Sequence, residues 1–257
     1  MNYLVTVCAR AGSKGLKSKN IREFLGHPLC CYTLSALQLF RRRYADKYGS
    51  FTLALNTDSP ELIAQFNATG IDYILIPRKE ELGGDRVPKP DVIRDTLREC
   101  ERLTGTKFDA VMDMDLTSPL RRVEDIANII EAYRSTPGCE VALSLTDARR
   151  NPYFNQLAKG EDGFYHAAIE SDFVARQQAP EVFDANASLY VYSPEYLLGS
   201  GRILLKAKLA ASVMPDTAVL DIDGERDFEL MTLLAGYFYE KDPAYREVRD
   251  AIPQIGG

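Results

Sequence analysis

Short apolar runs alternate with longer segments of helical periodicity along most of the 257-residue chain. Residues 3–8 have the length and composition of a buried strand. Val123, Ile126 and Ile130 instead recur at helical spacing, which predicts an amphipathic helix. By the same criteria, strands are expected at residues 3–8, 51–56, 73–76, 110–114, 141–145, 187–192 and 217–222, and helices at residues 28–44, 60–68, 90–103, 123–133 and 226–239.

A strand followed by a helix, repeated several times, predicts an α/β fold of Rossmann-like type, with a mostly parallel sheet and helices on both of its faces. The pattern stops after about Asp147, and residues 149–184 mix aromatic and polar side chains without helical period. We therefore expect a small β-rich insertion at residues 147–185. Residues 1–146 and 186–257 then form one α/β domain.

The loop that follows the first expected strand carries the most distinctive chemistry of the chain. From Arg10 to Arg22 it contains five basic side chains, two glycines and no acidic residue. Glycine lets backbone N–H groups approach an anion, and the cations neutralise its charge, so the loop predicts a polyphosphate site. Neither the Walker A pattern nor the Rossmann glycine pattern is present. The alternative is a solvated charged loop.

Further polar groups follow other expected strands, at the sheet edge where α/β proteins bind ligands. Asp221 and Asp223 alternate along the last expected strand, so both carboxylates would project from one face. A hard divalent cation such as Mg²⁺ would relieve their mutual repulsion, whereas the alternative is that one of them caps the following helix. Residues 113–121 add carboxylates, hydroxyls and a cation, although such a turn can simply begin a helix.

Composition narrows the classes of partner. The chain has 31 basic and 37 acidic residues and a formal net charge of −6, which argues against nucleic acid or an anionic membrane. No apolar run approaches the ~20 residues that cross a bilayer. The five cysteines form no C-x-x-C pair, and only His27 and His166 offer imidazole, so zinc is not expected. We expect reduced thiols and a cytoplasmic protein.

Together these residues resemble a known enzyme family. The stretch Ala9-Arg-Ala-Gly-Ser-Lys-Gly-Leu-x-x-Lys-Asn20 is similar to the N-terminal nucleotide-binding motif of the CMP-sialic acid synthetases, or acylneuraminate cytidylyltransferases. The related CMP-KDO synthetases have a similar loop without this Ser-Lys-Gly and Lys-Asn form. Five further motifs match in family order, at residues 56–58, 82–85, 117–121, 176–178 and 221–223.

The resemblance implies a fold of the nucleotide-diphospho-sugar transferase type. It implies a Mg²⁺-dependent enzyme that joins CTP to the anomeric hydroxyl of a nine-carbon 2-keto sugar acid and releases pyrophosphate. It also implies a homodimer formed through the insertion.

The family motifs assign roles to residues by position. Catalytic roles fall on Arg10, Lys14, Lys19 and Asp223. Mg²⁺ ligation falls on Asp221 and Asp223. Nucleotide contacts fall on Ala9, Arg10, Gly12, Ser13, Asn20 and Asp85. Sugar contacts fall on Asp115, Thr117, Ser118, Arg121, Arg176, Gln178 and Asp184. Of these, Arg176 and Gln178 would act across the dimer interface.

Three departures from the family pattern fall in segments expected near the sugar. A Gln-Pro pair is replaced by Asp115-Leu116, an Asn-Gly-Ala by Asn186-Ala187-Ser188, and an arginine by Asp184. Carboxylates in place of a cation and an amide disfavour an unchanged anionic ligand, so we expect a shifted sugar specificity. Because Asp115 can accept bonds from extra N–H groups, a legionaminic, pseudaminic or amino-bearing sugar acid fits. A KDO-type enzyme and a nucleotide-binding relative without turnover are the alternatives.

Overall fold

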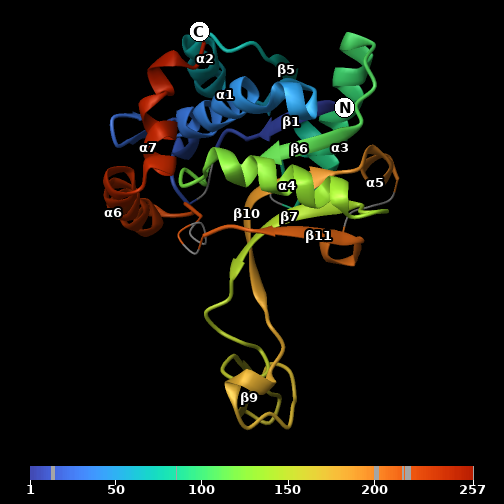
Figure 1. Ribbon diagram of the computed structural model, residues 1–257, viewed down its shortest axis with the longest axis vertical. Coiled ribbons are helices and arrows are strands. Elements are labelled where there is room, and N and C mark those ends of the chain that lie inside the picture. Colours follow the sequence, from blue (N-terminus) through green and yellow to red (C-terminus); the bar gives the residue numbers. More distant parts are fainter. Residues whose placement is uncertain (13–14, 85, 200–202, 216, 218–220, 257) are drawn as a thin grey trace.

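The computed structural model of the protein describes residues 1–12, 15–84, 86–199, 203–215, 217 and 221–256. At its centre lies a seven-stranded sheet with helices on both faces (Figure 1). The strand order is β11-β7-β10-β6-β1-β4-β5. In the described sheet β10 runs antiparallel to β6 and β7, and the other pairs are parallel, which confirms the predicted fold class. The strands are β1 (Asn2–Cys8), β4 (Ser50–Thr57), β5 (Ile74–Pro77), β6 (Ala110–Met114), β7 (Val141–Asp147), β10 (Phe183–Tyr192) and β11 (Leu209–Val213).

The helices lie close to the predicted segments, with two additions near the carboxyl-terminal half. Local sequence explains several of their starts: Ser59 accepts a hydrogen bond from the Leu62 N–H (3.2 Å), and Pro60 occupies the first turn of its helix. The short α5 and α7 were not predicted. The helices are α1 (Leu29–Tyr48), α2 (Pro60–Thr69), α3 (Lys89–Thr104), α4 (Val123–Ser135), α5 (Pro194–Leu198), α6 (Glu225–Lys241) and α7 (Pro243–Asp250).

The alternation of side chains along β1 divides the core between the two faces of the sheet. Tyr3, Val5 and Val7 are buried in a cluster with residues of α1, α4 and α6. Leu4 points to the opposite face, into a cluster with residues of α3 and α5. Both faces of this central strand are therefore covered, as its continuous apolar run predicts.

The register of the central strands brings their carboxyl ends together. β1 pairs with β4 as far as Cys8 and Asn56, and with β6 as far as Thr6 and Asp113. The loops that follow β1, β4 and β6 therefore leave the sheet at a common edge, where open α/β sheets bind ligands.

Two sequence expectations near the end of the sheet differ from the structure. β11 was not predicted, because only Ala210 in this short edge strand is buried and the apolar pattern is weak. The strand expected at residues 217–222 is wrong for the described residues Asp221 and Ile222, which lie in no strand. The Ile222 side chain is buried and anchors a connection into α6 instead. Residues 218–220 lie outside the described residues.

The chain between β7 and β10 projects from the body of the molecule (Figure 1, bottom). It carries a hairpin of β8 (Leu157–Lys159) and β9 (Tyr165–Ala167) and the one-turn helix η3 (Arg176–Gln178). β7 and β10 continue into the predicted range of the insertion, so the projecting part begins after Asp147. Several of its large apolar side chains are exposed: Phe154, Leu157, Phe164, Tyr165, Ile169, Phe173 and Val174.

The remaining described elements are short. All five cysteines are free thiols. Within the part of the chain that the structure describes, no helix combines the length and apolarity needed to cross a bilayer. The short elements are β2 (Glu23–Phe24), β3 (His27–Pro28), η1 (Lys19–Ile21), η2 (Glu80–Leu82), η4 (Leu204–Lys206) and η6 (Ile252–Gln254).

Candidate active site

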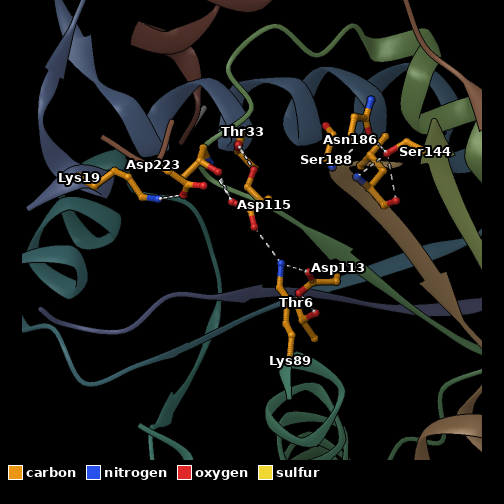
Figure 2. Close-up of polar contacts among 12 residues, drawn as sticks. Thr6, Lys19, Thr33, Lys89, Asp113, Asp115, Ser144, Asn186, Ser188 and Asp223 are labelled. Atoms are coloured by element: carbon orange, nitrogen blue, oxygen red, sulfur yellow. Dashed lines mark hydrogen bonds and ion pairs between the residues drawn. The ribbon is translucent and has the colours of Figure 1, made fainter. Parts of the chain in front are cut away.

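A cleft of about 530 Å³ opens where the carboxyl ends of β1 and β6 meet. Residues 9–12, 15–22 and 221–223 form what we call its loop side, and residues 113–121 and 186–188 form its β6–β10 side. Figure 2 shows the Lys19–Asp223 pair on one side of Asp115, with Asn186 and Ser188 on the other. The cleft is lined by Val7, Cys8, Ala9, Arg10, Gly15, Lys19, Asn20, Met114, Asp115, Leu116, Thr117, Ala187, Asp221 and Asp223.

The start of the basic loop is fixed by the end of the neighbouring strand. The Ala9 N–H donates to the Asn56 carbonyl (3.1 Å), and the Ala11 N–H donates to Asp58 Oδ1 (2.6 Å). Arg78 in turn donates from Nε to the buried Asn56 Oδ1 (2.9 Å). The motif at residues 56–58 therefore acts as a support for the loop. Gly12, which follows, has a φ of 73°, a conformation that favours glycine.

The loop is in direct backbone contact with the segment that carries the paired aspartates. A Cβ atom at Gly15 would lie 1.9 Å from the carbonyl oxygen of Asp223, so only glycine permits this approach. Lys19 Nζ lies 3.2 Å from Asp223 Oδ1. The basic loop and the two aspartates thus share one cleft, as the sequence predicts, although the aspartates lie on a connection and not on a strand.

A second contact ties the loop side to α6. The Arg22 guanidinium donates two hydrogen bonds to the Glu225 carboxylate, at 2.7 and 2.6 Å. It also lies over the Phe228 ring, with 4.2 Å from Cζ to the ring centre. Because Asp223 lies two residues before Glu225, this fork helps to hold Asp223 against the loop.

The two aspartates of the loop side are only partly compensated by positive charge. Burial, together with the nearby Asp115 and Asp223 carboxylates, raises the pKa of Asp221 to about 7. The Asp223 side chain is 83% exposed, although Lys19 contacts it. In the described residues no three His, Cys, Asp or Glu side chains form a metal-binding group. Two carboxylates completed by substrate phosphates are nevertheless a common way to hold Mg²⁺, so the donor set fits that ion.

On the β6–β10 side, a lysine that the sequence analysis missed lies between two aspartates. Lys89 Nζ is 2.7 Å from Asp113 Oδ2 and 2.9 Å from Asp115 Oδ2 (Figure 2). Asp113 is fully buried and also accepts a hydrogen bond from Thr6 Oγ1 (2.8 Å). The available signal was the spacing of Asp113 and Asp115, because two alternate carboxylates at the end of a buried strand require a cation.

Asp115 has few acceptor positions left for a ligand. Its Oδ1 accepts hydrogen bonds from the Thr117 N–H (2.9 Å) and hydroxyl (2.7 Å), and its Oδ2 faces Lys89. Burial opposes ionisation, but the Lys89 ammonium and the Thr117 donors hold the pKa of Asp115 well below its usual range. Asp115 is therefore a fixed anion at the floor of the cleft.

Arg121 is buried behind the β6–β10 side. The residue is 1% exposed, and its guanidinium donates to Ser188 Oγ (3.0 Å), the Ser188 carbonyl (2.8 Å), Thr33 Oγ1 (3.0 Å) and the Asp115 carbonyl (2.8 Å). These contacts hold the β6–β10 side together, and a contact of Arg121 with the sugar stays a prediction. Ser118 is likewise buried and does not line the cleft.

A break in the β10–β7 pairing shapes the β6–β10 side of the cleft. The register shifts between Ala185 and Tyr190, and Ala187 adopts a φ of 53° at this bulge. Asn186 Oδ1 accepts a hydrogen bond from Ser144 Oγ (2.5 Å). Asp184, also on β10, pairs with Thr146 of β7 and is not among the cleft-lining residues.

Several predicted site residues are not placed at the cleft. Arg176 lies in the insertion, which projects away from the sheet (Figure 1), and it lines a second cavity of about 500 Å³ instead of the cleft. Gln178 Oε1 accepts hydrogen bonds from the N–H groups of Val174 (2.9 Å) and Ala175 (3.1 Å). Three further predicted residues lie outside the described residues, namely Ser13, Lys14 and Asp85.

Comparison with known proteins agrees with this geometry. The cytidylyltransferase family matches residues 4–198. Over 234 residues the chain is 31% identical to the post-translational flagellin modification protein B of Campylobacter coli and 32% identical to CMP-N,N'-diacetyllegionaminic acid synthase of Campylobacter jejuni. Each match covers 90% of this chain and 94% of the relative.

Solved structures show the same fold. CMP:2-keto-3-deoxy-manno-octonic acid synthetase in complex with CTP matches with a TM-score of 0.63, over 92% of this chain and 99% of that chain, at 15% sequence identity. The family match, the relatives in Campylobacter and the motifs read from the sequence agree. The chain belongs to the cytidylyltransferase family.

Proposed function

We propose that this chain is a CMP-nonulosonic acid synthetase, which joins CTP to the anomeric hydroxyl of a nine-carbon 2-keto sugar acid. The observation that carries the proposal is the single cleft in which Lys19 and Asp223 lie 3.2 Å apart, with Arg10, Asn20 and Asp221 in the same lining. Family membership supports a cytidine nucleotide. The 32% identity to CMP-N,N'-diacetyllegionaminic acid synthase supports a sialic acid-like acceptor.

In the proposed reaction, the acceptor hydroxyl oxygen forms a bond to the α-phosphorus of CTP. The bond from that phosphorus to the bridging oxygen breaks, pyrophosphate leaves, and the hydroxyl proton is released. Such a transfer depends on alignment and charge neutralisation more than on covalent catalysis. Arg10 and Lys19 would contact the triphosphate, together with Lys14, and Asn20 would contact the cytidine.

Asp221 and Asp223 would hold Mg²⁺ on the loop side. Their fit rests on the position of both carboxylates in one cleft, where the Asp223 side chain is 83% exposed, and the raised pKa of Asp221 agrees with it. When bound, Mg²⁺ would neutralise phosphate charge and lower the pKa of the acceptor hydroxyl. The protein's own part is to present the Asp223 carboxylate beside Lys19 and to keep the Gly15 backbone against it.

The sugar acid would lie against the β6–β10 side, where Thr117 and Ala187 line the cleft. A homodimer is part of the proposal, because Arg176 and Gln178 could reach a cleft only in a second copy of the chain. The exposed apolar side chains of the insertion, among them Phe164 and Val174, favour such a partner. A cytoplasmic location agrees with the five free thiols.

The direct test is an assay of the purified chain with CTP and Mg²⁺ against four acceptors: N,N'-diacetyllegionaminate, pseudaminate, N-acetylneuraminate and 2-keto-3-deoxy-manno-octonate. Pyrophosphate release and the CMP-sugar are measured together, so that simple CTP hydrolysis is recognised. The proposal predicts a CMP-sugar from at least one nine-carbon acid. Turnover of only the eight-carbon acid, or CTP binding without any turnover, would contradict it.

A further inference from the structure

Ala187 holds a backbone conformation that an alanine rarely adopts. Its φ of 53° lies in the left-handed region, where the Cβ atom is crowded by the backbone. A strained residue of this kind persists only when its surroundings fix it, and such residues cluster at functional sites. Ala187 also lines the cleft.

The surroundings of Ala187 fix it from both sides. Asn186 accepts from Ser144 Oγ, and the Leu189 N–H donates to the same hydroxyl (2.9 Å), so the two ends of the bulge share one buried partner. Ser188 is held by Arg121, and its carbonyl accepts from the Asp115 N–H (3.1 Å). The bulge is therefore fastened to both β7 and the end of β6, and the position of the Ala187 methyl group is not free to adjust.

The place of this methyl group in the cleft indicates which ligand it would meet. Asn186 and Ser188 lie on the opposite side of Asp115 from the Lys19–Asp223 pair (Figure 2). Ala187, between Asn186 and Ser188 in the chain, therefore belongs to the β6–β10 side of the cleft, whereas the groups expected to bind the triphosphate belong to the loop side. Ala187, Met114 and Leu116 are the apolar members of the lining on the β6–β10 side. On an N-acylated sugar acid, the methyl end of the acyl group is apolar enough to suit such a wall.

We propose that Ala187 is a specificity-determining residue that limits the size of the N-acyl group on the acceptor. The inference rests on the proposed function, because it assigns the β6–β10 side to the sugar acid. The rigid bulge holds the methyl group against the space into which a longer acyl chain would extend. An acetyl group fits, and propanoyl or butanoyl groups are excluded.

The test compares Ala187→Gly with Ala185→Gly, which makes the same change at an exposed position of the same strand, outside the cleft. kcat/KM is measured for acceptors with acetyl, propanoyl and butanoyl groups, together with the KM for CTP and the unfolding equilibrium. We expect Ala187→Gly to raise the relative kcat/KM for the butanoyl acceptor at least ~10-fold. The KM for CTP stays unchanged, and the folding equilibrium constant rises by about two- to five-fold because the left-handed strain is relieved.

The control separates this role from a purely structural one. Ala185→Gly should leave the acyl preference unchanged and lower stability slightly, because glycine weakens a strand interior. If Ala187→Gly gains stability but keeps the wild-type acyl preference within two-fold, the inference is overturned while the proposed function stands. If the wild-type chain turns over none of the sugar acids, the proposed function itself fails and the inference falls with it.

Discussion

The two sides of the cleft are built from different kinds of contact. The loop side is held mainly through the backbone: Gly15 touches the Asp223 carbonyl, and the N–H groups of Ala9 and Ala11 bind the end of β4. The β6–β10 side is held by buried charged and polar side chains, with Lys89 and Arg121 at their centres. Backbone contacts on the loop side require glycine at fixed positions. On the β6–β10 side, two paired side chains can be replaced together.

This difference suits the two proposed ligands. A triphosphate is the same in every cytidylyltransferase, so the loop side has little reason to vary. The sugar acid varies, and the departures at Asp115 and Ala187 from the expected family pattern both fall on the β6–β10 side. We therefore expect mutations on the β6–β10 side to change mainly stability and sugar specificity, and mutations on the loop side to change mainly turnover.

The largest expected effect is on stability, from Lys89→Met. It leaves the Asp113 and Asp115 carboxylates together without their cation, which should cost about 3 kcal/mol of unfolding free energy at pH 7, given that Lys89 is one-third exposed. Urea denaturation measures this change. Lys107→Met is the matched control, since Lys107 pairs with Glu101 at an exposed site and its loss should cost less than about 0.5 kcal/mol.

The difference in unfolding free energy between wild type and Lys89→Met should depend on pH in a defined direction. The depressed pKa of Asp115 contributes stability above the unfolded value of about 4, and this contribution is lost as the pH falls through the folded pKa. In Lys89→Met, protonation of the carboxylates relieves their repulsion. The stability difference between wild type and variant should therefore narrow in acid. A difference that stays constant from pH 7 to pH 4 would show that Lys89 acts by packing alone.

On the loop side, Gly15→Ala should lower turnover by about 10²-fold with little change in stability. The new Cβ atom would collide with the Asp223 carbonyl, so the loop and the aspartate must separate, and a shift of about 1 Å at reacting groups has this effect. Gly236→Ala on α6 is the control, because its Cβ atom would make only an ordinary contact with Leu25. Normal turnover by the Gly15 variant would break the proposed link between backbone contact and catalysis.

The affinity of the free protein for Mg²⁺ should depend on pH through Asp221. Its pKa is raised to about 7, so protons compete with the cation below that pH, and the Kd for Mg²⁺ should rise about ten-fold per pH unit. Calorimetry between pH 5.5 and 8 provides the curve. A flat profile over this range would remove Asp221 from the metal site.

The smallest effect is expected from Arg22→Ala, which removes the fork to Glu225 and the contact with Phe228. The ion pair is exposed, so we expect only a small loss of stability and a modest rise in the KM for CTP. Thermal unfolding and steady-state kinetics measure the two. A loss of stability as large as that of Lys89→Met would mean that the loop side also depends on side chains, which would remove the contrast between the two sides.

Sequence patterns predicted most of the fold, because β1, β4 and β6 are continuous apolar runs and α4 has clear helical spacing. The loop side could also be predicted, because glycine and lysine that follow a strand are typical of an anion-binding loop. The failures have physical causes. β11 buries one side chain, so its pattern is faint, and Ile222 resembles a strand residue although it anchors a connection.

The β6–β10 side was harder to predict because its partners are distant in sequence. Lys89 and Asp115 are 26 residues apart, and Arg121 and Ser188 are 67 residues apart. A lone lysine at a helix start and an arginine in a turn look like solvent-exposed residues until the fold brings their partners to them. For that reason the sequence analysis missed Lys89 and did not predict the structural contacts of Arg121.

The central claim is that the basic loop and the paired aspartates hold one triphosphate through a shared cation, and the most direct measurement is the effect of Mg²⁺ on CTP affinity in Asp223→Asn. Calorimetry with wild type, Asp223→Asn and the exposed control Asp46→Asn isolates this group, because the Asp223 side chain is 83% exposed and its loss should not unfold the chain. We predict that Mg²⁺ strengthens CTP binding at least ~10-fold in wild type and Asp46→Asn, but less than about two-fold in Asp223→Asn. An undiminished Mg²⁺ effect in Asp223→Asn would contradict the account.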